Sequence, residues 1–506
     1  MHTVIVGAGS AGAVIAARLS ESTAHEVTLL EAGPDYPTVP ATPADLRDGR
    51  RNSMRAHDWG YRLKPTREQT MPFEFPRGRV VGGSSAVNTC IALRGHPYDY
   101  DEWAELGLPE WSFAACLPAF RRLEHDLDHD NEWHGQSGPI PIRRHERSEL
   151  VPWQAGFLEA CGALGFPETT DHNNPELPAG YGPHSMNRIA GERMSASRCY
   201  LTQEVRQRPN LHIRSGLHAV RVAIVGRRAT GVVVRSASGS TETIAADRVV
   251  LSAGAVGSLG ILLRSGVGPK AELDRLGVER IIDSPSVGRR LLDHPGVAMI
   301  LTPRLGIASI EDPLIQVMVR YTSKNSDHPS DMAMQPGSNL PLGNLCFPFV
   351  TMMTCIGKPK GSGTIHFPSA DPFAKPEVAS RFLEHPEDRA RAVEAVARMW
   401  EVSRTPPLRD LAFPLFPSRS TLDRRGRIEE TLPFVCGSGY HPCGTVPMGA
   451  SSIDEGAIDQ FGRVRGVDGL QVADASIMPT IPSANTNLAS LMIGERFGEW
   501  LRDGHA

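Results

Sequence analysis

A short strand, a glycine-rich turn and a helix at the start of the chain constrain the fold most strongly. A β-branched run at 3–6 precedes the sequence GAGSAG at 7–12, after which small apolar residues continue at helical spacing to Ser20. A second run of buried-strand type follows at 26–33, one helix-length crossover later. Strands joined in this way lie parallel in one sheet, so the chain is predicted to begin with a βαβ unit.

The glycines of this turn have the spacing of a dinucleotide-binding loop. Gly7 makes the tight turn, Gly9 lets the backbone approach a pyrophosphate, and Gly12 lets the helix pack on the strand. Glu31 ends the second strand, where a carboxylate accepts hydrogen bonds from the ribose hydroxyls of an unphosphorylated adenosine. The pattern therefore predicts a bound dinucleotide, but it does not separate NAD from FAD.

The later sequence predicts a return to this sheet and a second, antiparallel sheet. A strand, a Gly-rich turn and a helix at 248–268 favour another parallel strand, and alternating runs at 211–236 predict a small meander. Short apolar runs separated by Pro, Gly, Ser and Asn at 298–370 predict an antiparallel sheet that could wall a substrate pocket, followed by a helix near 387–403. The fold class is therefore α/β, with a Rossmann-like domain of parallel sheet and β-meander, and an α+β substrate lobe whose antiparallel sheet is flanked by helices.

Composition and charge argue against several classes of partner. The formal net charge is −4, and 53 basic and 57 acidic residues are interspersed, so no basic stripe could follow a phosphate backbone and we expect no nucleic-acid partner. No window holds the roughly 18 consecutive apolar residues of a membrane span, so we expect a cytoplasmic protein without one. The eight cysteines have no metal-ligand spacing, so we expect reduced thiols and no metal.

A glycine- and serine-rich segment separates the two possible cofactors. GRVVGGSSAVNTCIALRGHPYDYD at 78–101 resembles the first signature of the glucose/methanol/choline (GMC) oxidoreductase family, FAD enzymes that act mostly on alcohols. Consecutive Gly-Gly-Ser-Ser lets backbone N–H groups approach a pyrophosphate and a flavin ring. The segment at 254–268 is similar to the second signature except at Leu259, and LLDHP at 291–295 and GERMSASRCYL at 191–201 are also family-like. The resemblance covers nearly the whole chain.

Length and resemblance together predict two domains that alternate along the chain. At 506 residues the chain is longer than one hydrophobic core usually supports. We expect the FAD-binding domain at 1–150, 191–297 and 431–506, the last part carrying the active-site histidine and asparagine, and the substrate domain at 151–190 and 298–430.

The resemblance also implies which residues contact FAD. Val220 would meet the adenine through its backbone, Asp474 and Ala475 would lie beside the ribityl chain, and the helix opening at Thr486 would point its positive end at the flavin ring. In some choline-oxidising relatives a histidine at the position of Val87 bonds covalently to the flavin; valine cannot, so we expect non-covalent FAD. The expected cofactor-binding residues are Gly7, Gly9, Ser10, Ala11, Gly12, Glu31, Ala32, Val81, Gly83, Ser84, Asn88, Val220, Tyr440, Asp474, Ala475 and Thr486.

The reacting end of the site is expected near the C-terminus. His441 matches the family's catalytic histidine, and Asn485 matches a position that relatives fill with asparagine or a second histidine, with Asn487 as a competitor. A neutral imidazole, with an ordinary pKa of ~6.5, can accept the hydroxyl proton of an alcohol, and an amide can donate a hydrogen bond to the same oxygen. We therefore expect hydride transfer from an alcohol α-carbon to flavin N5, with His441 as base and Asn485 as hydrogen-bonding partner.

Substrate and electron acceptor stay open at this point. The pocket walls expected from 298–350 and 435–440 mix apolar, Ser and Asn residues without a charged cluster, which favours a small neutral alcohol or a sugar as substrate. Electrons would pass to O2 or to another acceptor. The alternative is an FAD-containing cyanohydrin lyase of the same fold. A light-driven decarboxylase of the family would lack His441, and a non-catalytic flavin-binding module would not need both members of the pair.

Overall fold

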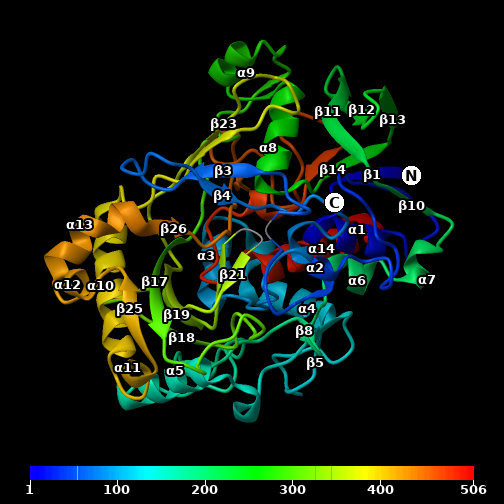
Figure 1. Ribbon diagram of the computed structural model, residues 1–506. Helices are drawn as coiled ribbons and strands as arrows, with labels where there is room; N and C mark the ends of the chain where they lie inside the picture. Colours follow the sequence, from blue (N-terminus) through cyan, green and yellow to red (C-terminus); the bar gives the residue numbers. More distant parts are fainter. Residues whose placement is uncertain (54, 325, 343–344, 506) are drawn as a thin grey trace.

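Two large sheets, each with its own helices, form the two halves of the molecule (Figure 1). The structure is a computed structural model that describes every residue except 54, 325, 343, 344 and 506. A five-stranded parallel sheet organises one half and a seven-stranded antiparallel sheet the other. The predicted α/β class with an α+β lobe is therefore confirmed.

The parallel sheet is built from both ends of the chain and from its middle. Its strand order is β10-β2-β1-β14-β27, with bounds β10 (Leu211–Arg214), β2 (Glu26–Leu30), β1 (His2–Val6), β14 (Arg248–Leu251) and β27 (Leu470–Val472). Apolar side chains of β1, β2 and β14 are buried, as expected for strands covered on both faces. Because parallel strands end at one edge, the residues that follow Val6, Leu30 and Leu251 come together there.

Two helices from opposite ends of the chain pack against each other beside this sheet (Figure 1). They are α1 (Ser10–Leu19) and α14 (Thr486–Asp503). The contact is close, because a Cβ atom added at Gly494 would lie 2.8 Å from the carbonyl oxygen of Ala11. Arg18 also forms a 2.9 Å ion pair with the fully buried Glu495. The N-terminal βαβ unit is thus completed by the last helix.

The prediction for 211–236 was wrong in its first part. Residues 211–214 form β10, which pairs in parallel with β2. The meander consists of β11 (Leu217–Val225), β12 (Arg228–Ser236) and β13 (Thr241–Ala245). Gly216, at φ +72°, redirects the chain from one sheet to the other. A glycine between two short alternating runs is also the sequence pattern of a hairpin, so the pattern alone did not show this change of sheet.

The antiparallel sheet has one face against helices and one face against a cavity. Its order is β25-β17-β22-β19-β18-β7, with bounds β25 (Ala412–Phe416), β17 (Pro295–Pro303), β22 (Val350–Ile356), β19 (Met332–Gly337), β18 (Val317–Tyr321) and β7 (Tyr181–Pro183), and β26 (Cys436–Ser438) also pairs with β17. Along β22, Val350 and Met352 belong to a core shared with α5 (Pro152–Ala163) and α10 (Pro386–Ser403), whereas Thr351 and Met353 line the cavity. The helix predicted near 387–403 is confirmed as α10.

The remaining elements are short or cover the edges of these two halves. The helices are α2 (Ala44–Arg47), α3 (Pro97–Glu105), α4 (Phe113–Leu123), α6 (Ala196–Tyr200), α7 (Gln203–Arg206), α8 (Gly254–Arg264), α9 (Lys270–Leu276), α11 (Leu408–Leu411), α12 (Arg419–Leu422) and α13 (Arg425–Val435). The strands are β3 (Tyr61–Lys64), β4 (Phe73–Phe75), β5 (Glu124–Asp126), β6 (Ile140–Ile142), β8 (Arg188–Ile189), β9 (Glu192–Arg193), β15 (Val267–Gly268), β16 (Ile282–Asp283), β20 (Leu340–Leu342), β21 (Leu345–Phe347), β23 (Thr364–His366) and β24 (Glu377–Ala379).

Candidate active site

A cavity of about 730 Å³ extends from the parallel sheet to the antiparallel sheet. At one end it is lined by Gly7, Glu31 and Ser252, which directly follow β1, β2 and β14. At the other end it is lined by side chains of the antiparallel sheet, among them Ala298 and Met353. Ligands of open α/β sheets bind outside the carboxyl ends of the strands, so the first end has the position of a cofactor site.

Two glycine loops meet at this first end. Gly9 precedes α1, and Gly83 opens the short 3-10 helix at Gly83–Ala86. A Cβ atom added at Gly83 would lie only 2.6 Å from the Cα of Gly9, and Gly83 has φ +52°. Both residues line the cavity. Backbone of this kind lets a pyrophosphate approach without side-chain interference, so the loops fit a dinucleotide.

Three helix N-termini also point into the cavity. The first residues of α1, α8 and α14, namely Ser10, Gly254 and Thr486, are all lining residues. First-turn N–H groups have no partner within their own helix, and together with the helix dipole they favour a negatively charged ligand. The cofactor end of the cavity is therefore suited to phosphate groups and to a ring that gains negative charge.

Glu31 lies at the end of β2 as predicted, and its carboxylate is held by two backbone groups. It accepts hydrogen bonds from the amides of Gly33 at 2.8 Å and Ala8 at 3.1 Å. Burial raises the pKa of Glu31 to about 7, because the effect of burial is larger than the opposite effect of these hydrogen bonds. A carboxylate with two fixed donors keeps its remaining lone pairs for ribose hydroxyls, so this position fits the adenosine of a dinucleotide.

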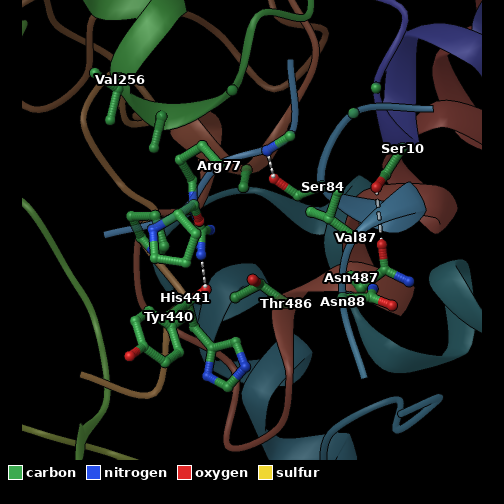
Figure 2. Close-up of a pocket in the computed structure, with 18 of the residues that line it drawn as sticks. Ser10, Arg77, Ser84, Val87, Asn88, Val256, Tyr440, His441, Thr486 and Asn487 are labelled. Atoms are coloured by element: carbon green, nitrogen blue, oxygen red, sulfur yellow. Dashed lines mark hydrogen bonds between the residues drawn. The ribbon is translucent and has the colours of Figure 1, made fainter. Parts of the chain in front are cut away.

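His441 and Asn485 meet in the cavity. Nδ2 of Asn485 lies 2.9 Å from Nε2 of His441, and both residues line the cavity wall. Burial, with contributions from His294 and Arg77, lowers the pKa of His441 well below its ordinary value, so the ring is neutral at neutral pH. Asn487 has a different partner, because its Oδ1 accepts a 2.8 Å hydrogen bond from Ser10 on the glycine-loop side (Figure 2).

The backbone of His441 is fixed independently of its ring. Oδ1 of Asp293 accepts a 2.8 Å hydrogen bond from the His441 amide, and Oδ2 accepts a hydrogen bond from Ser438. Arg77 donates a 2.8 Å hydrogen bond to the carbonyl of Tyr440, whose φ of +65° is unusual for a residue with a side chain (Figure 2). These contacts hold the turn that presents the imidazole.

Most of the predicted cofactor residues line the cavity, and three lie outside its lining. The lining residues among them are Gly7, Gly9, Ser10, Ala11, Glu31, Ala32, Gly83, Ser84, Asn88, Tyr440, Asp474, Ala475 and Thr486. Gly12 has a packing position, since a Cβ there would lie 1.9 Å from the Gly7 carbonyl oxygen. The Val220 carbonyl accepts a 2.7 Å hydrogen bond from Arg264, and the lining residues of the meander are 217–219. Val81 lies next to the first signature's glycines and is buried.

Sequence reasoning missed three features of this site. It did not single out Arg77, it did not pair Asn487 with Ser10, and it gave no role to His294, whose Nδ1 lies 2.9 Å from Nδ1 of His441. Of these, only His294 could have been singled out from the sequence, because it belongs to the segment LLDHP, which resembles the family. Each of these contacts joins residues far apart in the chain, and no local pattern encodes such a pairing.

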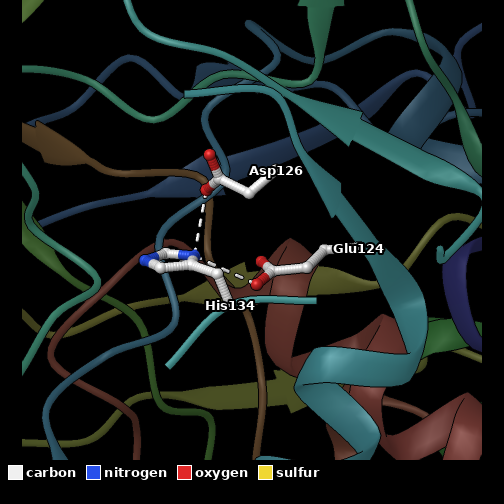
Figure 3. A group of neighbouring side chains, drawn as sticks. All are labelled: Glu124, Asp126 and His134. Atoms are coloured by element: carbon white, nitrogen blue, oxygen red, sulfur yellow. Dashed lines mark hydrogen bonds and ion pairs between the residues drawn. The ribbon is translucent and has the colours of Figure 1, made fainter. Parts of the chain in front are cut away.

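A separate group of buried side chains has the composition of a metal site. Glu124, Asp126 and His134 lie within ligand distance of one another (Figure 3). Nδ1 of His134 is 3.1 Å from Glu124 and 2.9 Å from Asp126, and its Nε2 is 2.7 Å from Asp171. Burial disfavours the imidazolium, but the hydrogen bonds to these carboxylates outweigh it and raise the pKa of His134 to about 10.

Two guanidinium groups complete this cluster. Arg94 pairs with Glu124, and Arg144 pairs with Asp126 and Asp171 at 2.9 and 2.7 Å. Three carboxylates are thus matched by two guanidinium groups and one imidazolium. A buried ion network with balanced charge is stable without a metal ion, so we interpret the cluster as structural.

Within the described ranges, none of the helices is both long and apolar enough to span a bilayer.

Comparison with known proteins gives one family over most of the chain. Models of the N- and C-terminal parts of GMC oxidoreductases match residues 1–296 and 359–494. The chain is 34% identical to a 5-(hydroxymethyl)furfural oxidase of Methylovorus sp. (strain MP688), with 98% of this chain and 97% of the relative covered. It is 30% identical to an oxygen-dependent choline dehydrogenase of Vibrio vulnificus (strain YJ016), with 97% and 92% covered. Among solved structures, pyridoxine 4-oxidase from Mesorbium loti superposes with a TM-score of 0.90 at 28% identity over the full length of both chains.

Proposed function

The chain belongs to the GMC oxidoreductase family, and from this premise we propose that it oxidises a neutral alcohol with His441 as base and Asn485 as hydrogen-bonding partner. It is an FAD-dependent oxidoreductase that acts on alcohols. FAD supplies the acceptor for the hydride that leaves the alcohol carbon. The observation that carries the proposed roles is the 2.9 Å contact between Asn485 Nδ2 and His441 Nε2 in the cavity wall.

The geometry of this contact suits an alcohol. A hydroxyl group that replaces this contact can donate its hydrogen to the Nε2 lone pair of His441 and accept one from Nδ2 of Asn485. As the hydroxyl proton moves to His441, the amide stabilises the negative charge that develops on the oxygen. Burial keeps His441 neutral and therefore able to accept that proton.

The substrate end of the cavity favours an uncharged molecule. The lining side chains of its sheet wall are mainly apolar, including Ala298, Met318 and Met353. Among the described lining residues the acidic ones are Glu31 and Asp474, and both lie at the strand ends of the cofactor site. Asp293 contacts the backbone of His441 but does not line the cavity, so a cationic substrate such as choline would meet no carboxylate among the described residues of the substrate end, and a neutral alcohol is the better fit.

Gln335 adds a polar group to this apolar wall. It lies opposite Met353 in register on β19, and its Oε1 is 3.2 Å from Nε2 of the buried His184. Nδ1 of His184 has no hydrogen-bond partner among the described residues, and a bare nitrogen is tolerated there better than an orphaned N–H. His184 therefore donates from Nε2, and the amide N–H groups of Gln335 remain for the cavity. They would suit an alcohol with a hydrogen-bond acceptor at its far end.

An anaerobic substrate screen tests this function. We expect 5-(hydroxymethyl)furfural and other neutral primary alcohols with a distal acceptor to bleach the flavin absorbance faster than choline or a sugar does. Readmission of air then distinguishes an oxidase, whose flavin reoxidises at once, from a dehydrogenase that needs another acceptor. If every alcohol leaves the flavin oxidised while cyanohydrins release aldehyde, the chain is a lyase and the proposal is wrong.

The attachment of FAD gives a second prediction. Val87 lines the cavity and has no atom that could bond covalently to the flavin. We expect acid precipitation of the holoenzyme to leave all of the flavin absorbance in the supernatant. Yellow colour that stays in the washed pellet would contradict non-covalent binding.

A further inference from the structure

His294 lies directly behind the imidazole of His441. It immediately precedes β17 and is buried. Its Nδ1 is 2.9 Å from Nδ1 of His441, and its Nε2 is 3.0 Å from the carbonyl oxygen of Pro482. The two rings meet edge to face, with centroids 5.0 Å apart at an angle of 73°. Both ring nitrogens of His294 are therefore engaged, one with the protein backbone and one with His441.

The ring protons of the two histidines follow from the donors and acceptors in these contacts and from the neutral state of both rings. A carbonyl oxygen only accepts hydrogen bonds, so Nε2 of His294 carries a hydrogen and donates it to Pro482. A neutral imidazole carries one ring hydrogen, and burial lowers the pKa of His294 to about 4, so its Nδ1 is an acceptor. The hydrogen between the two Nδ1 atoms then belongs to His441. Because His441 is neutral too, its Nε2 carries a bare lone pair.

We propose that His294 is the positioning residue that keeps His441 in the Nδ1–H tautomer, with the basic Nε2 lone pair directed at Asn485 and the substrate. The proposal rests on the role of His441 as base. The opposite tautomer would place an N–H of His441 against the amide N–H of Asn485, two donors at 2.9 Å, and would leave no lone pair for the alcohol proton.

Asp293 and His294 thus hold different parts of His441. The carboxylate of Asp293 accepts the main-chain N–H of His441 at 2.8 Å, and His294 accepts the ring N–H. The acceptor behind the ring is an uncharged imidazole. When His441 takes up the substrate proton, its Nδ1–H bond to His294 persists, so the ring keeps its orientation through the proton transfer. Gly439 leaves room for both rings, since a Cβ there would lie 3.0 Å from Nδ1 of His441.

Three variants of the FAD-loaded enzyme separate positioning from mere packing. In His294→Leu the acceptor behind His441 is lost, and we expect the limiting rate of anaerobic flavin reduction to fall by about 10²-fold or more. His294→Asn places an amide oxygen near the position of Nδ1, so its rate should stay within about tenfold of the wild type. His172→Leu is the matched control, because His172 is another buried histidine that does not line the cavity, and its limiting rate should equal that of the wild type.

In all three variants the substrate concentration at half-maximal reduction rate should change little, because the cavity lining that binds the alcohol is retained. Equal losses in the Leu and Asn variants would show that His294 only fills space and would overturn the proposal. A loss confined to substrate binding, with the limiting rate intact, would also overturn it.

A spectroscopic measurement on the wild-type holoenzyme tests the tautomer without turnover. In 15N-histidine-labelled protein, the resonances of His441 are identified by their loss in His441→Ala. We expect Nδ1 to be protonated and Nε2 bare in the wild type and in His294→Asn, and this state to be lost in His294→Leu. A bare Nδ1 in the wild type, or an unchanged tautomer in His294→Leu, would refute the role of His294. This readout stays valid even if flavin reduction in His441→Ala were normal, a result that would refute the proposed function alone.

Discussion

Replacing His441 by alanine is expected to slow flavin reduction by alcohol about 10²–10⁴-fold, which corresponds to a loss of roughly 3–5 kcal/mol of barrier lowering. In the proposed mechanism the imidazole takes the hydroxyl proton, and the amide of Asn485, whose Nδ2 lies 2.9 Å from Nε2 of His441, donates a hydrogen bond to the same oxygen. The variant should still bind FAD, because the glycine loops and helix N-termini of the cofactor end do not depend on this side chain. Anaerobic stopped-flow mixing with saturating substrate measures the effect.

The control for this variant is His172→Ala, which removes another buried imidazole outside the cavity and should reduce flavin at the wild-type rate. The pH profile supplies an independent check. The pKa of His441 is lowered by burial, and the base must be unprotonated, so activity is expected to be lost only as the pH falls through a value well below 6.5. Near-normal reduction in His441→Ala, or an acidic limb above pH 6.5 that disappears with His441, would contradict the assignment.

Substituting alanine for Gly83 is expected to yield protein that retains little FAD. The added Cβ would lie 2.6 Å from the Cα of Gly9, and alanine would also have to adopt φ +52°. The substitution would strain the two glycine loops by about 1–3 kcal/mol. Because these loops lie where a pyrophosphate would bind, the affinity for FAD should drop roughly tenfold or more. The ratio of flavin absorbance to protein after gel filtration, followed by titration with FAD, measures this loss.

Gly226→Ala is the matched control for the glycine effect. Gly226 has a similar φ of +61°, but a Cβ there would meet no other atom within 4 Å, and the residue lies in the turn between β11 and β12. Its substitution should lower the free energy of unfolding by about 1 kcal/mol through backbone strain and leave the FAD content unchanged. Equal flavin loss in both variants would mean that left-handed backbone strain, and not the contact between the two loops, limits FAD binding.

The parts of the fold that local patterns encode could be predicted from the sequence. The βαβ unit follows from a strand, three spaced glycines and a helix within 30 residues, and α10 follows from apolar residues at helical spacing. The change of sheet at Gly216 could not be predicted, because β10 pairs with β2, a strand some 185 residues earlier in the chain, and no local pattern encodes that pairing.

In the candidate active site, too, some residues could be predicted from the sequence whereas their contacts could not. His441 and Asn485 were singled out because the sequence around them resembles that of the family. The geometry that brings their nitrogens together is set by β17, β26 and α14. His294 illustrates the limit: the segment that contains it resembles the family, but its partner lies 147 residues away, and only the folded chain shows that Nδ1 of His294 lies 2.9 Å from Nδ1 of His441.

The pairing of α1 with α14 has a consequence for biosynthesis. The first glycine loop is synthesised early, but β27 and α14, which complete its sheet and cover its helix, are synthesised only after the strands of the antiparallel sheet. Domains that fold during translation usually do so from the N-terminus onward. The nascent βαβ segment therefore lacks these partners while the antiparallel sheet is being synthesised, and the parallel sheet can be completed only after the strands of the antiparallel sheet have left the ribosome.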